Sequence, residues 1–362
     1  MIRLSQSSLL KSILVGVSIA LMAGGVWVIY TSPESVSREG VRLDTPSNDA
    51  PIFLAVESGD TAADIGNRLE AAEIIDSATS FERLVRMIGA EGRLVAGEYE
   101  FLEGTSVLDA LTRVRDGLTA ARIVTLREGL RIEEVAEVME ARGVVTADEF
   151  LAAANAIAAS GSAVDGSLLA SRPASSTLEG YLYPATYSFP RSIDADQAVL
   201  MMIEALSTRL TPELRAEAEA KGLSIHQVLI LASIVEREAV LPEERALIAS
   251  VFLNRIAEAM PLQADPTVQY ALTQRPGSVQ EFGYWKRSLT LEDLQFASTY
   301  NTYVQTGLPP GPIASPGIAS ITAVIRPAQT NFHFFVATGD GGHVFAETFE
   351  DHLANVERYQ PQ

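Results

Sequence analysis

The hydrophobic pattern begins with an uninterrupted apolar run near the start of the chain. Residues 12–33 carry no charge, and the segment ILVGVSIALMAGGVWVIY within them is almost wholly apolar. At about 1.5 Å of rise per residue, roughly 20 helical residues cross a hydrocarbon layer of about 30 Å. Basic residues precede the run, whereas Trp27 and Tyr30 lie where the far interface would be. The pattern predicts a single transmembrane helix over residues 12–33, with residues 1–11 in the cytoplasm.

A cleaved signal peptide is the alternative for this segment. Its apolar stretch is longer than an ordinary h-region, and no small-x-small cleavage site precedes Glu34, so we favour an uncleaved anchor. The following residues, 34–50, are polar and contain Pro and Ser, which is typical of a linker with little to bury. The globular part is therefore expected to begin near residue 51.

Two later segments share one arrangement of apolar positions. LAVESGDTAADIGNRLEAAEIIDSATSF and VTLREGLRIEEVAEVMEARGVVTADEF each run from a strand through a Gly turn into an amphipathic helix, followed by an apolar pair. One face of each helix can pack on a small sheet, and the Gly permits the turn. The pattern predicts two copies of one βα unit. The matched positions are Gly59 with Gly129, Ile65 with Val135, Leu69 with Met139, and Ile74 and Ile75 with Val144 and Val145.

The segment between the two copies, LVAGEYEFLEGTSVLDALTRVRDG, predicts a strand over residues 99–102 and a helix from a Ser106 cap to Gly117. From spacing alone the units are small α/β packing modules. Contact with carbohydrate or cell wall is the functional alternative, and the sequence does not separate the two. We assign residues 51–120 to a small domain and residues 121–175 to the second βα unit and a connector.

A strongly apolar helical segment, GLSIHQVLILASIVEREAVLPEE, ends in carboxylates. Ser224 and Gln227 form a capping-box pattern at its start, and Pro242 suits the first turn of the next helix. The helix should therefore end just after Glu238. At about 100° per residue, Glu238 projects toward the apolar face, and Glu236 diverges from it by about 200°. One cleft cannot easily use both side chains, so they are not a catalytic pair.

The chemistry expected of Glu238 follows from its surroundings. Burial beside apolar groups and the negative end of a helix both disfavour the ionised carboxyl group, so we expect its pKa to be raised. A Glu that is protonated near neutral pH can act as the general acid that gives its proton to a leaving glycosidic oxygen. The alternative is an ordinary terminal-turn glutamate paired with Arg237, Arg245 or Arg255.

Two downstream segments, ASVFLNRIAEAMPLQADPTVQYAL and STYNTYVQTGLPPGPIASPGIASITAVIRPA, are rich in turn formers and aromatic residues and are predicted to be site loops. Their polar groups supply hydrogen bonds and their tyrosines supply flat faces, the mixture that a sugar-binding cleft uses. Asp265 before Pro266 is by itself more typical of a turn residue. The candidates are Asn254, Gln263, Thr267, Asn301 and Thr302 together with Tyr270, Tyr300 and Tyr303.

Composition narrows the functional classes. Of the 362 residues, 47% are hydrophobic and 20% are charged, which indicates a mostly globular chain. The net charge of −19 argues against nucleic acid as a partner, and the absence of cysteine excludes disulfides and thiolate sites. His333, His343 and His352 follow no zinc motif, and FHFFVATGDGGHVF is better explained as a β-hairpin, so we expect no metal and no cofactor. A Ser-His-Asp hydrolase is disfavoured because no G-x-S-x-G motif occurs.

Several long motifs stand in a characteristic order: LEGYLYPATY, ASIVEREA, SVFLNRI, LQADPTVQYAL, YNTYVQTGLPPGPIASPG and FFVATGDGGHVFAETFEDH. In them the sequence resembles the endolytic murein transglycosylase (MltG, or YceG-like) family over nearly its whole length. The resemblance implies an α+β fold with a membrane helix, a small βα region that is LysM-like, and a mixed catalytic domain over residues 176–362. One departure is Ala185 in YPATY, where the family usually has Asp.

The resemblance also implies an activity. It is cleavage within peptidoglycan glycan strands, at the MurNAc–GlcNAc β-1,4 bond, by a lyase on the outer side of the cytoplasmic (inner) membrane. The family's catalytic residue, the second glutamate of an E-[KR]-E pair, matches Glu238. It would protonate the leaving oxygen and then deprotonate the MurNAc 6-hydroxyl, which attacks the anomeric carbon and leaves a 1,6-anhydro end. Because this nucleophile is part of the substrate, one carboxylate suffices.

The same resemblance predicts further site residues and partners. Such an enzyme would limit or terminate elongation of nascent strands, and peptidoglycan synthases and division proteins are its candidate protein partners. Positions that match family motifs are predicted to position the glycan. They are Glu179, Tyr181, Gln263, Asp265, Thr267, Tyr300, Asn301 and Thr302.

Two other functions remain open from the sequence. The first is a hydrolytic muramidase in which Glu238 works with Asp265, and it would leave reducing MurNAc ends. The second is a non-catalytic, wall-binding scaffold of the cell-wall synthesis machinery, which would not depend on Glu238 for any of its effects.

Overall fold

The computed structural model describes residues 51–161 and 166–360. The predicted transmembrane helix over residues 12–33 and the predicted linker over residues 34–50 lie outside these ranges. Within the described part, no single helix is long and apolar enough to cross a membrane, and one pair of helices bent by 94° meets that requirement only when taken together. The membrane anchor therefore stays a prediction.

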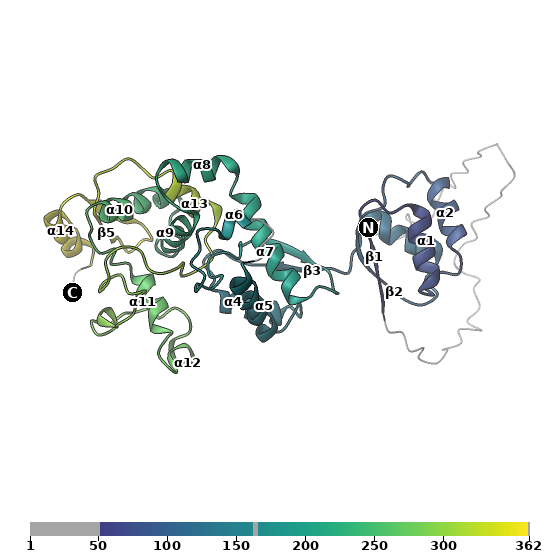
Figure 1. Cartoon of the computed structure of the whole chain (residues 1–362), viewed down its shortest axis with the longest axis horizontal. Helices are drawn as coiled ribbons and strands as arrows, with labels where there is room; N and C mark the ends of the chain where they lie inside the picture. The colour runs from purple at the N-terminus through teal and green to yellow at the C-terminus, as the bar shows by residue number, and fades with distance from the viewer. Residues whose placement is uncertain (1–50, 162–165, 361–362) are drawn as a thin grey trace, which may run out of the picture. The chain divides into compact units, whose positions relative to one another are not determined.

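A βααβ unit with a hydrophobic core of its own opens the described chain (Figure 1). Its elements, with the helix that follows them, are β1 (Ile52–Val56), α1 (Ala62–Ala71), α2 (Ala78–Met87), β2 (Gly97–Phe101) and α3 (Val107–Asp116). β1 pairs antiparallel with β2, and Ile52 lies opposite Phe101. Gly59 has φ 96° in the turn before α1, where a residue with a Cβ would be strained. Ser106 caps α3 and Gly117 ends it, as predicted.

A second unit repeats the order of strand, helix and helix. Its elements are β3 (Arg122–Thr125), α4 (Ile132–Ala141), α5 (Ala147–Ser160), the short α6 (Gly166–Leu169) and the closing strand β4 (Thr186–Phe189). β3 pairs antiparallel with β4. Gly129 has φ 77°, as the matched Gly59 has φ 96°, and Met139 is fully buried in α4 as Leu69 is in α1. The predicted repeat is confirmed at these positions, whereas the LysM-like character of the first unit stays a prediction.

The second unit shares its core with the rest of the chain. Val124 of β3 and Phe150 of α5 belong to the same buried cluster as Leu231 in the central helix of the following part. The first unit has a separate cluster. The boundary predicted between residues 121–175 and 176–362 therefore does not divide one core from another.

The remaining helical elements include one central helix, α9 (Ile225–Glu238), on which four others pack. They are α7 (Ala195–Arg209), α8 (Pro212–Ala220), α9 (Ile225–Glu238), the 3-10 turn η1 (Pro242–Glu244), α10 (Arg245–Ala257), α11 (Asp265–Leu272), α12 (Ser278–Phe282), the 3-10 turn η2 (Asp293–Gln295) and α13 (Ile318–Ile325). α8, α10, α11 and α13 all pack on α9. Ser224 and Gln227 form the predicted capping box, and α9 ends at Glu238. Pro242 opens a 3-10 turn that leads into α10, not the first α-helical turn that the sequence predicted.

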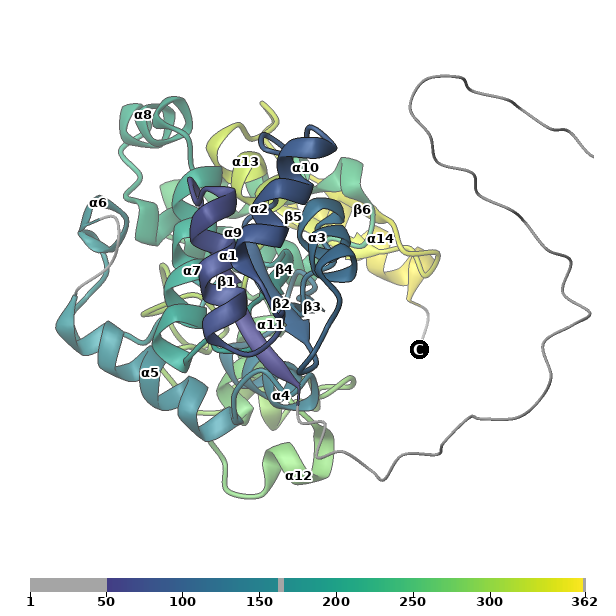
Figure 2. The same ribbon diagram turned by 90° about the vertical axis from the view of Figure 1, so that its right-hand side faces the viewer.

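The predicted C-terminal hairpin is present. β5 (Phe334–Ala337) pairs antiparallel with β6 (His343–Ala346), with Gly339 and Gly341 at positive φ in the turn. The last helix, α14 (Phe349–Tyr359), packs against both strands, and the two views agree in placing it beside them (Figures 1 and 2). The described chain is thus mixed α+β, as expected, with short antiparallel strand pairs and a helical core.

Candidate active site

Glu238 is the last residue of the central helix α9, and its surroundings differ sharply from those of an ordinary surface glutamate. Nine residues of α9 are buried, whereas Glu238 as a residue is only partly buried. Among the described residues, no group donates a hydrogen bond to its carboxyl group or forms a salt bridge with it. Burial raises the pKa of Glu238 to about 8, the charge of Asp265 raises it as well, and Arg237 opposes the two. Glu238 is therefore protonated at neutral pH.

This result agrees with the expected direction of the pKa shift and adds a cause that the sequence did not indicate, the charge of the Asp265 carboxylate. The alternative pairing with arginine is not found among the described residues. Arg245 pairs with Glu236 at 3.4 Å, and Arg255 is buried, where its guanidinium donates to backbone carbonyl oxygens.

Glu236 faces the other way and serves the fold. Its carboxylate accepts hydrogen bonds from the Gly317 amide at 2.9 Å and from the Ser320 hydroxyl at 2.7 Å, and its side chain is only 6% exposed. With Arg245 as a third partner, the carboxylate has the set of donors that stabilises a buried charge. The predicted divergence of Glu236 and Glu238 is confirmed by these separate surroundings.

Asp265 approaches Glu238 from the first turn of α11. Its Oδ1 accepts a hydrogen bond of 2.7 Å from the Tyr303 hydroxyl, and the Asp265 side chain is otherwise exposed. Gln263, two residues earlier, is also exposed and has φ 51°, a left-handed conformation that is uncommon for a residue with a Cβ. Arg255 supports this turn by donating to the Leu262 carbonyl at 2.8 Å and to Gln263 Oε1 at 3.3 Å. Two of the predicted glycan-positioning residues thus lie on the surface, and the charge of one of them, Asp265, acts on Glu238.

Three other predicted residues hold this surface from inside. Thr267 and Thr302 are buried, and their hydroxyl oxygens are 2.8 Å apart. The Thr302 hydroxyl also accepts from the Ala264 amide at 3.0 Å. Asn301 is fully buried and donates to the carbonyl oxygens of Leu294 and Phe296 at 3.1 and 2.8 Å. These enclosed and hydrogen-bonded side chains fix the loop that carries Tyr303, and their predicted contact with glycan stays a prediction.

Glu179 and Tyr181 are also interior residues. Glu179 is 2% exposed and accepts hydrogen bonds from the Ile132 amide, at the start of α4, at 3.1 and 3.3 Å. Burial raises its pKa to about 8, so it too holds a proton at neutral pH. The Tyr181 hydroxyl lies 2.9 Å from Nδ1 of His226 in the core. Both side chains are buried and join α4 and α9, and their predicted contact with glycan stays a prediction.

Comparison with known proteins decides the family. The YceG-like family model matches residues 54–358. The chain belongs to the YceG-like family. A Bacillus subtilis protein named endolytic murein transglycosylase is 30% identical over 318 residues, covering 85% of this chain and 84% of that protein. A Streptococcus pneumoniae protein of the same name is 29% identical over 330 residues, covering 85% of this chain and 58% of that protein.

A solved structure supports the same assignment. The crystal structure of a yceG-like protein from Listeria monocytogenes matches this chain with a TM-score of 0.56 and 31% sequence identity. The match covers 85% of this chain and 99% of that one. The mixed α+β architecture is therefore that of a YceG-like protein.

Next to Glu238, this YceG-like protein has an aromatic and cationic cluster that was not predicted from the sequence. The Arg237 guanidinium lies 3.8 Å from the centroid of the Trp285 ring and donates to the Gly129 carbonyl oxygen at 3.3 Å. The Trp285 Nε1–H donates to Glu134 Oε2 at 2.9 Å. The available signal was that Trp285 stands between Tyr284 and a lysine in GYWKR, away from any apolar run.

Tyr270 and Tyr300 extend this cluster. Their ring centroids are 4.7 Å apart, and the guanidinium of Arg131 lies 4.2 Å from the Tyr270 centroid. Both tyrosines are half-buried, and an added Cβ at Gly311 would lie 3.1 Å from the Tyr300 hydroxyl. The rings of Tyr270 and Tyr300 thus partly serve to pack the site loops. Glycan contact by Tyr300 stays a prediction.

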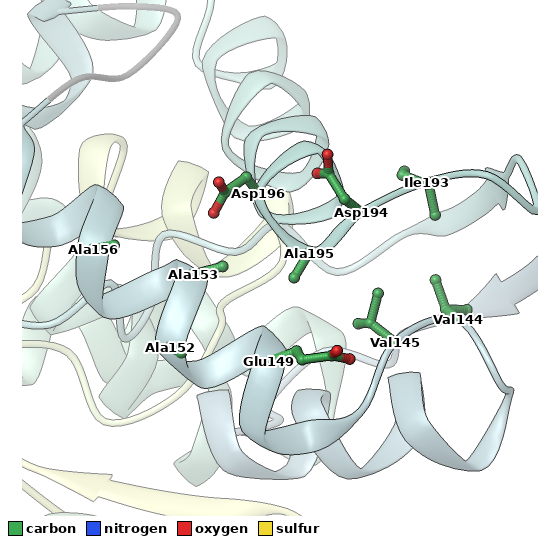
Figure 3. Close-up of a pocket in the computed structure, with 10 residues that line it drawn as sticks. All are labelled: Val144, Val145, Glu149, Ala152, Ala153, Ala156, Ile193, Asp194, Ala195 and Asp196. Atoms are coloured by element: carbon green, nitrogen blue, oxygen red, sulfur yellow. The ribbon is translucent and has the colours of Figure 1, made fainter.

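Two surface cavities lie away from Glu238. One, of about 670 Å³, runs between α5 and the start of α7 (Figure 3). Its floor is apolar, and two of its carboxylates cap helices, since Glu149 bonds to the start of α5 and Asp194 to the start of α7. A second cavity, of about 320 Å³, includes Ala185 and Arg209 in its lining. Neither contains a predicted site residue.

The C-terminal histidines have separate neighbours. His343 Nδ1 lies 2.7 Å from Glu244, His333 lies 3.2 Å from Glu258, and His352 stacks on Phe334. Over the described ranges no group of three or more His, Asp or Glu side chains is arranged to hold a metal ion.

Proposed function

We propose that this YceG-like protein is a lytic transglycosylase that cleaves peptidoglycan with Glu238 as its only acid and base. The observation that carries the proposal is one carboxyl group, at the end of the central helix, that is protonated at neutral pH and lacks a hydrogen-bond partner among the described residues. The names of the relatives from Bacillus subtilis and Streptococcus pneumoniae support the same activity.

In the first step Glu238 donates its proton to the glycosidic oxygen between MurNAc and GlcNAc. The bond between that oxygen and the anomeric carbon then breaks, and the electron pair stays on the leaving oxygen. A raised pKa favours this step because the acid must still hold its proton at the working pH. The Glu238 carboxylate that results is partly buried and has Asp265 nearby, so it is a stronger base than a free glutamate.

In the second step the Glu238 carboxylate accepts the proton of the MurNAc 6-hydroxyl, whose oxygen attacks the anomeric carbon. The product is a 1,6-anhydro ring, and Glu238 regains its starting state without water. Since the nucleophile belongs to the substrate, its effective concentration is high and no second catalytic carboxylate is required. Glu236 is unsuited to this work because its own donors hold it.

The finer features of the function are part of the same proposal. Cleavage within strands, rather than at their ends, would limit the length of nascent glycan. The apolar run over residues 12–33 would anchor the enzyme in the cytoplasmic membrane, with the catalytic part facing the wall. The first βααβ unit would add contact with glycan, and synthases and division proteins would be its neighbours there.

Product analysis on purified peptidoglycan tests the proposal. The wild type should release fragments that end in 1,6-anhydro-MurNAc, and Glu238→Gln should release none while folding normally. Glu243→Gln is the matched control, because Glu243 lies five residues away and is exposed. Mass spectrometry separates the outcomes: reducing MurNAc ends would support the hydrolytic alternative, and a wall-binding scaffold would give no cleavage with either protein.

A further inference from the structure

Tyr303 has no part in the two steps described above, and Asp265 enters them only as a nearby charge. Asp265 begins α11, which packs on α9, and Tyr303 lies in the loop that Asn301 and Thr302 fix from inside. Their hydrogen bond of 2.7 Å joins two segments that are 38 residues apart. Tyr303 is partly buried, so the exposed Asp265 side chain is held at a fixed position beside Glu238.

We propose that Asp265, held in place by Tyr303, is the charge partner of Glu238, which keeps the proton on Glu238 until the glycosidic oxygen takes it. The inference rests on the proposed function and assigns both residues as positioning residues that act through Glu238. It differs from the hydrolytic alternative, because Asp265 activates no water and forms no bond to the sugar.

A single carboxyl group must be a good acid in the first step and a good base in the second. A neighbouring negative charge serves the second requirement directly, since two carboxylates in close proximity repel each other. Once Glu238 has given up its proton, that repulsion favours removal of the proton from the 6-hydroxyl. Asp265 exchanges no proton in either step, because Glu238 gives its proton to the glycosidic oxygen and regains one from the 6-hydroxyl.

The other charged groups near the end of α9 do not replace Asp265. Arg237 lies on the same helix and lowers the pKa of Glu238, but it is stacked on Trp285. Tyr303 is neutral, because burial raises the pKa of its hydroxyl. Four other charged side chains on the elements around α9 have partners of their own. They are Arg245 with Glu236, Glu244 with His343, Arg255 with backbone carbonyls, and Arg326 with Glu217.

The pH profile of kcat/KM tests this role. In the wild type the activity should fall as pH rises through the pKa of Glu238. Asp265→Asn removes the charge and should move that fall about one pH unit lower, with about fivefold lower kcat/KM at pH 8 and anhydro ends as the product. Asp148→Asn is the matched control, since Asp148 also lies in the first turn of a helix and is exposed.

Tyr303→Phe tests the positioning step. This variant keeps Asp265 but frees its side chain. The fall of kcat/KM with rising pH should therefore move to lower pH, by a smaller amount than in Asp265→Asn. In the double variant, Asp265→Asn has already removed the charge that the hydroxyl positions, so Tyr303→Phe should cause no further shift. An unchanged pH profile in Asp265→Asn, or full additivity in the double variant, would overturn the inference.

A second measurement needs no turnover. Carbon-13 NMR titration of the Glu238 carboxyl group should give a lower midpoint in Tyr303→Phe than in the wild type, and equal midpoints would contradict the inference. This readout holds even where Asp265→Asn fails to fold. It also separates the two proposals: absence of anhydro ends with the wild type would refute the proposed function, while the titration still reports the charge coupling.

Discussion

Replacement of Glu238 by Gln should make the protein more stable, by an amount that grows with pH. A Gln side chain has nearly the same shape and is always neutral, as Glu238 is in the folded protein at neutral pH. The unfolded chain, in contrast, ionises Glu238 at its ordinary pKa of 4.5. The catalytic group therefore lowers the stability of the wild type at every pH at which only the unfolded state has lost the proton.

The magnitude follows from the two pKa values of Glu238. The folded value of about 8 lies 3.5 units above the ordinary value of 4.5. At about 1.36 kcal/mol per unit, this is an upper limit of about 5 kcal/mol in the free energy of unfolding. Because Glu238 as a residue is only partly buried, we expect about half of that to be realised. The stability of the wild type should fall between about pH 4.5 and pH 8 and then level off.

Thermal unfolding between pH 5 and pH 9 measures the effect. Glu238→Gln should unfold at nearly the same temperature as the wild type at pH 5 and several degrees higher at pH 9, since about 1 kcal/mol shifts the unfolding temperature by roughly 2 to 4 °C in a domain of this order of size. The exposed Glu243→Gln variant should follow the wild type throughout. A difference that stays constant with pH, or a wild type that is the more stable protein at pH 9, would refute a raised pKa at Glu238.

Three further outcomes are expected. Glu236→Gln should lower the free energy of unfolding by about 2 to 4 kcal/mol, because a buried charge with three partners loses its ion pair, and calorimetry should show the loss without a change in product chemistry. Trp285→Ala should remove the stacking partner of Arg237, worth about 1 to 2 kcal/mol, and Trp285→Phe should restore part of it in urea titrations. A fragment of residues 121–362 should fold cooperatively by circular dichroism, whereas residues 176–362 should not, because the shared core would lose β3, α4 and α5.

Local signals account for what could be predicted about the fold. The start and end of α9 follow from Ser224, Gln227 and Glu238, all within one stretch of sequence. The repeat was visible because Gly59 and Gly129 each mark a turn that needs positive φ. These features depend on neighbours along the chain, which a single sequence contains.

The candidate site depends on contacts between distant segments, and these left no local pattern. Tyr303 meets Asp265 across 38 residues, and Arg237 meets the Gly129 carbonyl oxygen across 108. The Thr and Asn side chains of the loops were expected at the surface of a cleft, because such residues are usually exposed. Thr302, for example, is buried here because its hydroxyl satisfies the Ala264 amide.

The end of α9 meets two opposite requirements with two glutamates. Glu236 contributes to stability as a charged group, and its donors are Gly317 and Ser320 at the start of α13 and Arg245 of α10. Glu238 must stay neutral, and no described residue donates a hydrogen bond to it. Two residues of helix turn the side chains about 200° apart, so one helix end can present both environments without conflict. The second βα unit is required for this arrangement, since its Gly129 carbonyl holds Arg237 between the two. We infer that the unit belongs to the catalytic part of the enzyme, although its sequence repeats that of the separate small domain.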